Sequence, residues 1–341
     1  MMKKIVTFGE IMLRFAPPGH QRFVQTSVLE TTYGGAEANV AVSLANFGMD
    51  SVFITKLPKH EIGQAALNEL RRYGVDTSKI VRGGDRLGVY YLEKGASQRA
   101  SKVIYDRKKS AIAEAEPGEF DWDAIFKDAG WFHFTGITPA LSKNAAAICL
   151  QACKKAVDKG IRVSCDINYR KTLWDRDQAR EVMSGLMEYV DVCVLNEEDA
   201  ADVFSISAKN TDINSGILSH EGFIEVAKTL SDRFGFSIVG VTLRSSRTAS
   251  DNLWSAMLYD GEDACFAAEY PVHIVDRVGA GDAFSAAIIY ALMNDYELQK
   301  AVDFAAAASC FKHSIEGDFN QISVAEAEAL MKGGGSGRVQ R

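Results

Sequence analysis

Residues 276–284 read Asp276-Arg277-Val278-Gly279-Ala280-Gly281-Asp282-Ala283-Phe284, so that two glycines stand directly before an apolar run that continues to Met293. Glycine lets the backbone approach a ligand closely, and the first N–H groups of a helix have no partner within that helix. A helix that begins here would present free amides and the positive end of its dipole to an anion. The segment therefore predicts a phosphate-binding loop at the start of a helix.

Asp282 stands in the first turn of this predicted helix. An acidic residue at a helix start is ordinarily a cap. Beside an anion site, the same carboxylate can accept the proton of a substrate hydroxyl while the amides of Gly279, Ala280 and Gly281 stabilise a phosphoryl group in transfer. The segment alone leaves both interpretations open. It lacks the third glycine of a dinucleotide fingerprint and the Lys-Ser/Thr of a P-loop, which disfavours a dehydrogenase or a P-loop enzyme.

The rest of the chain alternates short β-rich runs with helical patterns. One helical pattern ends at Gly48 and another at Gly74, both of them residues suited to closing a helix. Such alternation is typical of an α/β fold with a mostly parallel sheet, whose ligands bind beyond the carboxyl ends of the strands. The predicted strands are residues 5–8, 52–54, 131–134, 163–165, 192–195 and 238–241.

Two regions, about 10–33 and 85–108, break this rhythm because polar and apolar residues alternate in them with no helix between. They predict strands outside the main sheet that form a small β lid. Near the end of the chain, residues 333–337 are almost all glycine, which is typical of a flexible linker. We therefore expect one domain over residues 1–331, with a discontinuous β lid, and a flexible tail at 332–341.

The chain has 341 residues, of which 47% are hydrophobic and 24% charged, as in ordinary globular proteins. Its net charge of −7 argues against binding to a nucleic-acid backbone. Glu10 and Arg14 interrupt the apolar start, so neither a secretion signal nor a membrane span is predicted, and the expected compartment is the cytoplasm. The six cysteines are scattered, which predicts reduced, buried thiols and no transition-metal site.

Two motifs together, Gly279-Ala280-Gly281-Asp282 and Gly34-Gly35-Ala36-Glu37-Ala38-Asn39, resemble those of the ribokinase-like (PfkB) family of sugar kinases, over residues 3–331. Within that family, residues 68–77 and 166–174 are most similar to the kinases of 2-keto-3-deoxygluconate (KDG). The resemblance implies a ribokinase-like fold with a β-sheet lid. It also implies ATP- and Mg²⁺-dependent transfer of a phosphoryl group to the terminal hydroxyl, giving the 6-phosphate, with Asp282 as general base and the amides of residues 279–281 as the anion hole.

A keto acid needs fixed cations for its carboxylate, and the planar fork of arginine binds both carboxylate oxygens. The resemblance implies that Arg107 and Arg170 do this, and that Asn39 holds sugar hydroxyls. Tyr90 and Tyr91 are neighbours on a predicted strand, so only one can face the substrate, and the resemblance favours Tyr90. The full implied substrate set is Gly34, Gly35, Asn39, Tyr90, Tyr105, Arg107, Arg170 and Asp318.

The nucleotide site departs from the family pattern, because residues 241–247 lack the glycines that relatives have after this strand. Arg and Ser side chains replace them. Asp199 stands where the family's Asn-x-x-Glu motif has Glu, and it would act on Mg²⁺ through water. A charged first turn that complements a helix dipole explains that segment equally well. The implied nucleotide set is Asn168, Asn196, Thr242, Arg244, Arg247, Gly279 and Gly281.

Two other functions remain open. Fructokinases share the pattern of residues 166–174, so the substrate could be fructose or another sugar or sugar acid. The altered nucleotide loop also allows a non-catalytic, sugar-binding regulator. Because exposed strand edges tend to pair with a second chain, we expect a homodimer formed through the lid.

Overall fold

A computed structural model describes residues 3–196, 198–208 and 219–333. Its main sheet has nine strands, in the order β14-β13-β12-β11-β10-β9-β1-β4, with β15 paired to β13. Six neighbours, from β12 to β4, are parallel, and β13 to β15 are antiparallel. The bounds are β1 (Lys4–Phe8), β4 (Ser51–Ile54), β9 (Ala129–Thr135), β10 (Arg162–Asp166), β11 (Val192–Asn196), β12 (Ile238–Ser246), β13 (Asp251–Tyr259), β14 (Ala264–Phe266) and β15 (Tyr270–His273).

All six predicted strands are present, and the predicted α/β class with a mostly parallel sheet is confirmed. The antiparallel extension by β13, β14 and β15 is not predicted by the sequence pattern described above. It follows from the β12–β13 hairpin, in which Val239 pairs with Tyr259 and Ser246 with Asn252. The hairpin turns the chain back along the sheet without a crossover helix.

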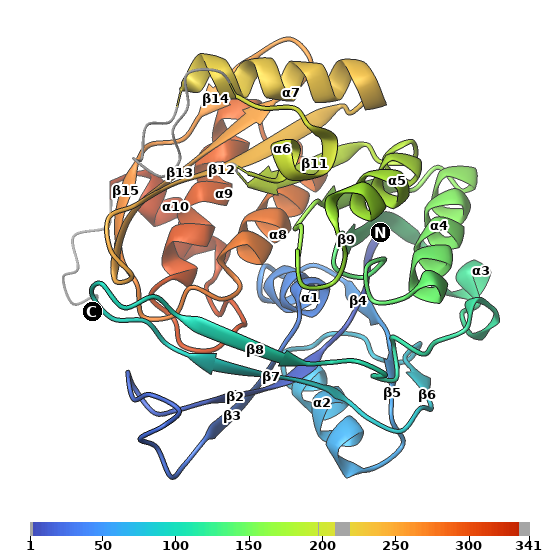
Figure 1. Cartoon of the computed structure of the whole chain (residues 1–341). Helices are drawn as coiled ribbons and strands as arrows, with labels where there is room; N and C mark the ends of the chain where they lie inside the picture. The colour runs from blue at the N-terminus through green and yellow to red at the C-terminus, as the bar shows by residue number, and fades with distance from the viewer. Residues whose placement is uncertain (1–2, 197, 209–218, 334–341) are drawn as a thin grey trace.

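Helices cover both faces of the main sheet (Figure 1). One face packs against α3 (Trp122–Ile125), α4 (Lys143–Asp158), α5 (Arg176–Met187), α6 (Asp199–Phe204) and α7 (His220–Phe234). The other packs against α1 (Ala36–Asn46), α8 (Ala280–Met293), α9 (Leu298–Lys312) and α10 (Val324–Met331). Each face therefore has its own apolar core, as expected of a parallel sheet buried on both sides.

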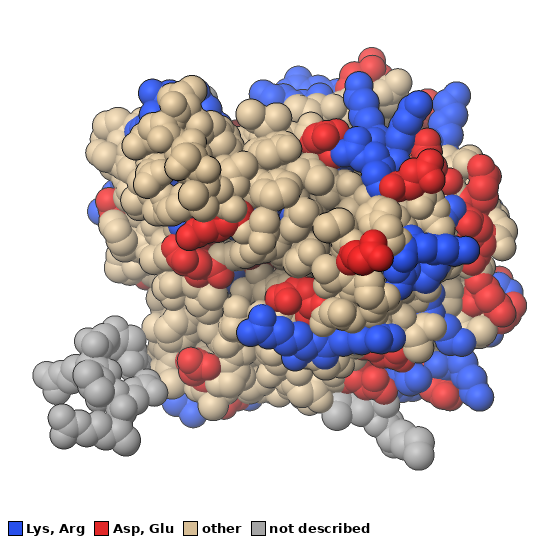
Figure 2. All heavy atoms as spheres, turned by 90° about the horizontal axis from the view of Figure 1, so that it is seen from below, with Lys and Arg blue, Asp and Glu red and all other residues tan. Residues whose placement is uncertain are grey.

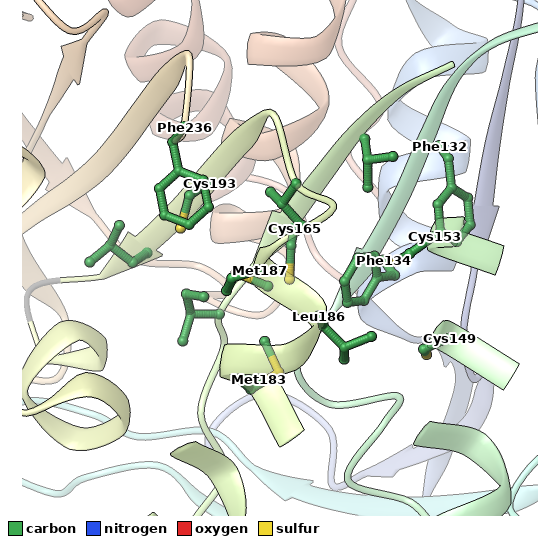
Figure 3. Close-up of a cluster of buried hydrophobic side chains, with 14 of the residues drawn as sticks. Phe132, Phe134, Cys149, Cys153, Cys165, Met183, Leu186, Met187, Cys193 and Phe236 are labelled. Atoms are coloured by element: carbon green, nitrogen blue, oxygen red, sulfur yellow. The ribbon is translucent and has the colours of Figure 1, made fainter. Parts of the chain in front are cut away.

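Four of the six cysteines lie in the core on the α4 and α5 side, among Phe, Met and Leu side chains (Figure 3). Cys149, Cys153, Cys165 and Cys193 are buried free thiols, and burial raises the pKa of each of them. Neutral thiols in such surroundings behave as small hydrophobic side chains. Cys265 and Cys310 are only partly buried, so the prediction of buried thiols is confirmed for four of the six cysteines and wrong for these two.

A second sheet forms the lid, in the order β3-β2-β7-β8. Its strands are β2 (Met12–Ala16), β3 (Glu30–Gly34), β7 (Gly88–Glu93) and β8 (Lys102–Asp106). Tyr90 faces inward and is buried, while Tyr91 points to the other face and stacks on Phe15. Beneath the lid lie α2 (Glu61–Arg72) and the short strands β5 (Lys56–Leu57) and β6 (Val81–Arg82).

The predicted helix ends are confirmed by backbone conformation. Gly48 (φ 82°) follows α1 and Gly74 (φ 80°) follows α2, and both adopt the left-handed conformation that favours glycine. In the part of the chain that is described, no helix is both long and apolar enough to cross a membrane. Most of the predicted tail, residues 334–341, lies outside the described residues.

Candidate active site

A cavity of about 530 Å³ lies between the carboxyl ends of β10, β11 and β12, the start of α8 and the inner face of the lid. This is the edge of the sheet at which an α/β fold binds its ligands, and the volume is that of a small-molecule site. The predicted residues that line it are Gly35, Asn39, Tyr90, Tyr105, Arg107, Asn168, Arg170, Asn196, Asp199, Thr242, Arg244, Gly279, Ala280, Gly281, Asp282 and Asp318.

Two predicted residues do not line this cavity. Arg247 is exposed on the turn between β12 and β13. Gly34 lies behind Asp318, because a Cβ at Gly34 would fall 1.9 Å from the Asp318 Oδ2 atom. The glycine therefore lets the Asp318 side chain pass close to the backbone of β3 rather than touching a ligand itself.

The start of α8 has the geometry that the sequence predicts. Gly279 is the N-cap residue with φ 87°, and α8 begins at Ala280. A Cβ at Gly279 would lie 2.0 Å from the backbone oxygen of Asp318, so only glycine fits there. At Gly281 a Cβ would have no heavy atom within 4 Å. Residues 279–281 therefore line the cavity as a tightly packed turn at the start of α8.

Asp282 lies on the cavity wall, and its carboxylate accepts a hydrogen bond of 2.6 Å from Asn39 Nδ2. The Oδ1 atom of Asn39 accepts a second hydrogen bond, 3.2 Å long, from the Gly35 amide. Burial raises the pKa of Asp282 to about 6, although the Asn39 hydrogen bond and the charges of Arg170 and Lys312 oppose the rise. Asp282 is therefore mostly ionised at neutral pH and able to take up a proton.

Asn39 contacts Asp282 in this structure. The resemblance implies that it holds sugar hydroxyls, but its amide nitrogen donates to Asp282 and its oxygen accepts from Gly35. These two contacts fix the orientation of the Asp282 carboxylate. The Asn39–Asp282 hydrogen bond joins α1 to α8 across 243 residues of sequence.

Glu37, the neighbour of Asn39 on the same helix, anchors α1 to β9. Its Oε1 atom accepts hydrogen bonds from the Thr135 amide (3.0 Å), the Thr135 hydroxyl (2.8 Å) and the Thr138 hydroxyl (2.6 Å). Burial raises the pKa of Glu37 to about 7. The glutamate thus secures the helix that carries Asn39.

The lid side of the cavity carries Arg107 in an ion pair with Glu10, and both side chains are buried. The Nε atom of Arg107 donates to Glu10 Oε2 at 2.8 Å, and Nη2 donates to the same oxygen. Ser110 donates to the other oxygen of Glu10 at 2.6 Å. The guanidinium carbon lies 5.3 Å from the centre of the Tyr105 ring. Arg107 is thus held by its Nε side, and Nη1 has no hydrogen-bond partner among the described residues.

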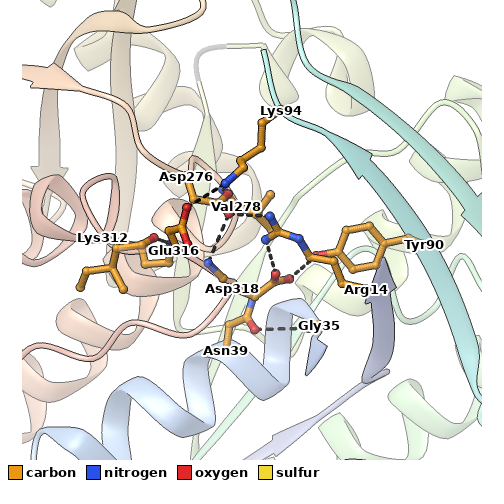
Figure 4. Close-up of polar contacts among 12 residues, drawn as sticks. Arg14, Gly35, Asn39, Tyr90, Lys94, Asp276, Val278, Lys312, Glu316 and Asp318 are labelled. Atoms are coloured by element: carbon orange, nitrogen blue, oxygen red, sulfur yellow. Dashed lines mark hydrogen bonds and ion pairs between the residues drawn. The ribbon is translucent and has the colours of Figure 1, made fainter. Parts of the chain in front are cut away.

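Arg14 on β2 is a site residue that the sequence pattern does not reveal. Its guanidinium pairs with Asp276 at 2.5 Å and with Asp318 at 2.8 Å, and the Tyr90 hydroxyl donates to Asp318 at 2.5 Å (Figure 4). From the sequence alone, the one role suggested for Arg14 is that its charge interrupts the apolar run at the start of the chain. The two-residue period of a strand places Arg14 on the same face of β2 as Met12, which lines the cavity.

The nucleotide half of the cavity holds a second unpredicted cation, Arg277. Its pKa is lowered by burial and by the nearby charge of Arg244. Both guanidiniums line the cavity. Two cations close enough to repel each other are stabilised by an anion between them, so this half of the cavity suits a polyphosphate.

Three carboxylates, Asp166, Asp199 and Asp282, gather between the two halves. Burial raises the pKa of Asp166 well above its usual range, and the charges of Asp199 and Asp282 add to this effect. The carboxylate of Asp199 accepts from the amides of Tyr169 (3.1 Å) and Asn196 (3.2 Å). Over residues 3–196, 198–208 and 219–333, no three acidic, His or Cys residues are placed to hold a metal directly. The oxygen donors fit a hydrated Mg²⁺, which keeps most of its waters.

The family model described as pfkB family carbohydrate kinase matches residues 2–320. A Haloferax volcanii protein named 2-dehydro-3-deoxygalactonokinase is 32% identical over 339 residues, which cover 99% of each chain. A crystal structure of 2-dehydro-3-deoxygluconokinase from Thermotoga maritima is 50% identical, with a TM-score of 0.94 over 97% of this chain and 100% of that chain.

A more distant structure is similar in fold alone. It is a putative ribokinase II from E. coli in complex with ATP and Mg²⁺, with 20% identity and a TM-score of 0.80 over 97% of this chain and 99% of that chain. The family model covers nearly the whole chain, and the motifs that suggest the family meet in one cavity. The chain therefore belongs to the PfkB family of carbohydrate kinases, as its sequence motifs predict.

Proposed function

We propose that the protein transfers the terminal phosphoryl group of ATP to the terminal hydroxyl of 2-keto-3-deoxygluconate, giving the 6-phosphate and ADP. One observation carries the proposal. Asp282, held by Asn39 at 2.6 Å, lies in the first turn of α8 in a cavity that Arg107 and Arg170 also line. The likeness to the Thermotoga maritima 2-dehydro-3-deoxygluconokinase structure supports the choice of substrate.

In this mechanism Asp282 accepts the proton of the terminal hydroxyl as its oxygen forms a bond to the γ-phosphorus. The bond between that phosphorus and the bridging oxygen of ADP breaks, and the electron pair leaves with ADP. The amides of residues 279–281 and the α8 dipole stabilise the charge on the phosphoryl oxygens in transfer. Asp282 then returns its proton to solvent.

ATP would lie in the half of the cavity lined by Asn168, Asn196, Thr242 and Arg244, with Arg277 beside them. Asp199 and Asn196 would hold Mg²⁺ through water molecules. When bound, Mg²⁺ neutralises part of the triphosphate charge. The E. coli ribokinase II complex with ATP and Mg²⁺, which has the same fold, supports this assignment.

The substrate carboxylate would bind Arg107, whose Nη1 side is not engaged by Glu10. Arg107→Ala should lower kcat/KM for KDG by about 10- to 100-fold, since a hydrogen bond to a charged group contributes about 1.5–3 kcal/mol. Turnover of a neutral sugar such as fructose should fall much less. Initial rates of ADP release over a range of sugar concentrations measure both.

Arg107→Ala also leaves Glu10 unpaired, which would repel an acid substrate by itself. The double variant Arg107→Met/Glu10→Gln removes both charges and should show the same selective loss. Equal losses for KDG and fructose in the double variant would remove Arg107 from acid recognition.

The C4 epimer of KDG is a second candidate substrate, because the Haloferax volcanii relative is named 2-dehydro-3-deoxygalactonokinase. ADP release should be measured with Mg-ATP and KDG, its galactonate epimer, fructose, ribose or gluconate. Turnover with the two 2-keto-3-deoxy acids supports the proposal. Turnover with a neutral sugar alone would replace the substrate but keep the Asp282 mechanism, and no turnover with any sugar would favour a sugar-binding regulator.

We also propose a homodimer formed through the lid. The edge strand β8 is exposed over its whole length, and the outer face of the sheet carries Phe15, Tyr91 and Ile104, of which Ile104 is 56% exposed. Figure 2 shows the molecule from the lid side, where charged side chains gather on one part of the face and leave a broad uncharged area. A second copy would cover this apolar face and the free edge.

Light scattering should give twice the chain mass of 37.3 kDa. Ile104→Lys should shift the protein toward the monomer, because it places a charge at the centre of the proposed contact. Val157→Lys, at a 48% exposed position on α4, is the matched control and should leave the mass unchanged. A wild-type monomer at assay concentration would overturn the dimer.

The free, buried thiols support a reducing compartment such as the cytoplasm.

A further inference from the structure

Buried charges connect the lid to the loop that forms the anion hole (Figure 4). Arg14 comes from the lid strand β2 and is 3% exposed. Its two partners, Asp276 and Asp318, come from the body of the protein, and their side chains are 1% and 2% exposed. The guanidinium thus contacts two carboxylates that lie outside its own sheet, in surroundings from which water is excluded.

Asp276 directly organises the anion-hole loop. Its Oδ1 atom accepts from the amide of Val278 at 3.2 Å, and Val278 immediately precedes Gly279. Its Oδ2 atom accepts from the Gly317 amide at 3.2 Å and from Arg14. One carboxylate therefore holds residues 276–279 against the loop at 317 and against the lid.

Asp318 packs against the same loop. Its backbone oxygen occupies the space where a Cβ of Gly279 would lie, at 2.0 Å. Its side chain accepts from the Tyr90 hydroxyl at 2.5 Å as well as from Arg14. Both partners of Arg14 are thus in contact with the turn whose amides face the phosphoryl group.

We propose that Arg14 is a positioning residue through which the lid sheet sets the geometry of the anion hole. The planar fork of arginine contacts both carboxylates at once, whereas the single ammonium of a lysine is a point charge. Lys312, buried at the end of α9 with its Nζ 3.0 Å from the Ile315 oxygen, supplies a second positive charge near the same carboxylates. The positive charges of Arg14 and Lys312 offset those of the two carboxylates, which reduces the cost of burying them.

This arrangement has a consequence for the reaction. The sugar is held on the lid side, and the phosphoryl group is held by the loop at 279–281. Arg14 forms an ionic connection between these two parts, through Asp276 and the cavity residue Asp318. Displacement of one part relative to the other by about 1 Å can cost about 100-fold in rate. The inference rests on the proposed function, because the quantity it affects is the rate of phosphoryl transfer.

The test is a double-mutant cycle in kcat with Arg14→Met, Asp276→Asn and the double variant. Each single variant should lower kcat by about 100-fold, with a much smaller change in KM for ATP. Because the two residues act as one unit, the double variant should lose about 100-fold rather than the product of about 10,000-fold. Arg14→Lys should recover part of the loss.

Thermal unfolding separates this role from a merely structural one. Arg14→Met removes the ion-pair partner of two buried carboxylates and should lower the melting temperature. Adding Asp276→Asn removes one of these charges and should restore part of the melting temperature. The double variant should therefore regain stability without regaining kcat.

Lys94→Met is the matched control. Lys94 also joins the lid to the body, by a 2.9 Å ion pair with Glu316, whose side chain is 68% exposed. Among the described residues, Lys94 forms no hydrogen bond or ion pair with Asp276 or Asp318. Its kcat should stay close to that of the wild type. The proposal would be overturned if the kcat losses of the two single variants multiplied in the double variant, or if kcat recovered together with the melting temperature. It would also be overturned if Lys94→Met lost as much kcat as Arg14→Met.

The assay uses whichever sugar the wild type phosphorylates, so a wrong choice of sugar does not affect the result. If the wild type phosphorylates a sugar and Arg14→Met has the same kcat, this inference alone is overturned. A wild type with no turnover on any sugar overturns the proposed function and this inference together.

Discussion

Asp282→Asn should lower kcat by roughly 1,000-fold, within the range that general base catalysis contributes. Asparagine has nearly the same shape and can still accept the Asn39 hydrogen bond, so the sugar and ATP should bind almost as tightly as in the wild type. It cannot accept the proton of the substrate hydroxyl. Steady-state kinetics gives kcat, and calorimetry with each substrate gives the two dissociation constants.

The pH dependence gives a second check on the same residue. Burial and the Asp318 charge raise the pKa of Asp282 to about 6, against the opposing effects of Asn39, Arg170 and Lys312. Burial raises the pKa of the nearby Asp166 carboxyl, and the charge of Asp282 adds to this effect. Because the base must be ionised, kcat/KM of the wild type should fall as the pH decreases through about 6. This acid limb should be absent from the residual activity of Asp282→Asn.

The same pKa predicts the sign of a stability effect. Between the unfolded pKa of 3.8 and the folded value of about 6, the folded protein binds more protons than the unfolded chain. The Asp282 carboxyl therefore reduces stability as the pH rises through this window. Asp282→Asn should melt at a higher temperature than the wild type at pH 8, and the difference should shrink as the pH falls below about 6.

Glu37→Gln is the matched control for Asp282→Asn. Glu37 is also a buried carboxyl on the cavity wall with a raised pKa, but its Oε1 atom accepts from Thr135 and Thr138, which a glutamine oxygen can still do. Its kcat should remain close to that of the wild type. If Asp282→Asn kept wild-type kcat, or if Glu37→Gln lost as much, Asp282 would not be the base.

Gly279→Ala should reduce both stability and activity. Gly279 has φ 87°, and an added Cβ would lie 2.0 Å from the Asp318 backbone oxygen. The left-handed backbone costs a residue with a side chain about 1–3 kcal/mol, and relief of the clash requires the loop to move. A shift of about 1 Å in the amides should lower kcat by about 100-fold. Urea unfolding and steady-state kinetics measure the two effects.

Gly281→Ala provides a control from the same motif. It lies within α8, and its Cβ would have no heavy atom within 4 Å. Alanine is favoured over glycine inside a helix by about 0.5–1 kcal/mol, so the variant should be at least as stable as the wild type. Any loss of activity in Gly281→Ala would then report contact with ATP. Wild-type stability and kcat in Gly279→Ala would contradict the assigned geometry.

Much of the fold follows from residues that are close together in the chain. The alternation of β-rich runs and helical patterns predicts all six parallel strands, and Gly48 and Gly74 mark the ends of two helices. The junction at Gly279 was also predictable, because a left-handed turn before a helix is a local property of glycine. The lid could be predicted because alternating polar and apolar residues indicate strands without regard to their partners.

The assembly of the site depends on contacts between distant residues. Asn39 is polar on an apolar helix, which points to a role, but the choice of Asp282 as its partner comes from the packing of α1 against α8. Arg107 is a plausible ligand for a carboxylate, yet its pairing with Glu10 joins residues 97 apart. The pairing of both β14 and β15 with β13 is likewise a property of the assembled sheet.

Local patterns in the sequence determine the α/β class, the strands, the helix ends and the glycine turn before Asp282. These features depend on backbone preferences and on side chains a few residues apart. Tertiary structure alone decides that Arg14 meets Asp318, 304 residues away, and that Asp276 bridges the lid and the anion-hole loop. The physical reason is that a buried charge needs a partner, but many acidic residues could serve as that partner. The packing of the lid against the loops before α8 and after α9 brings Arg14 within reach of Asp276 and Asp318.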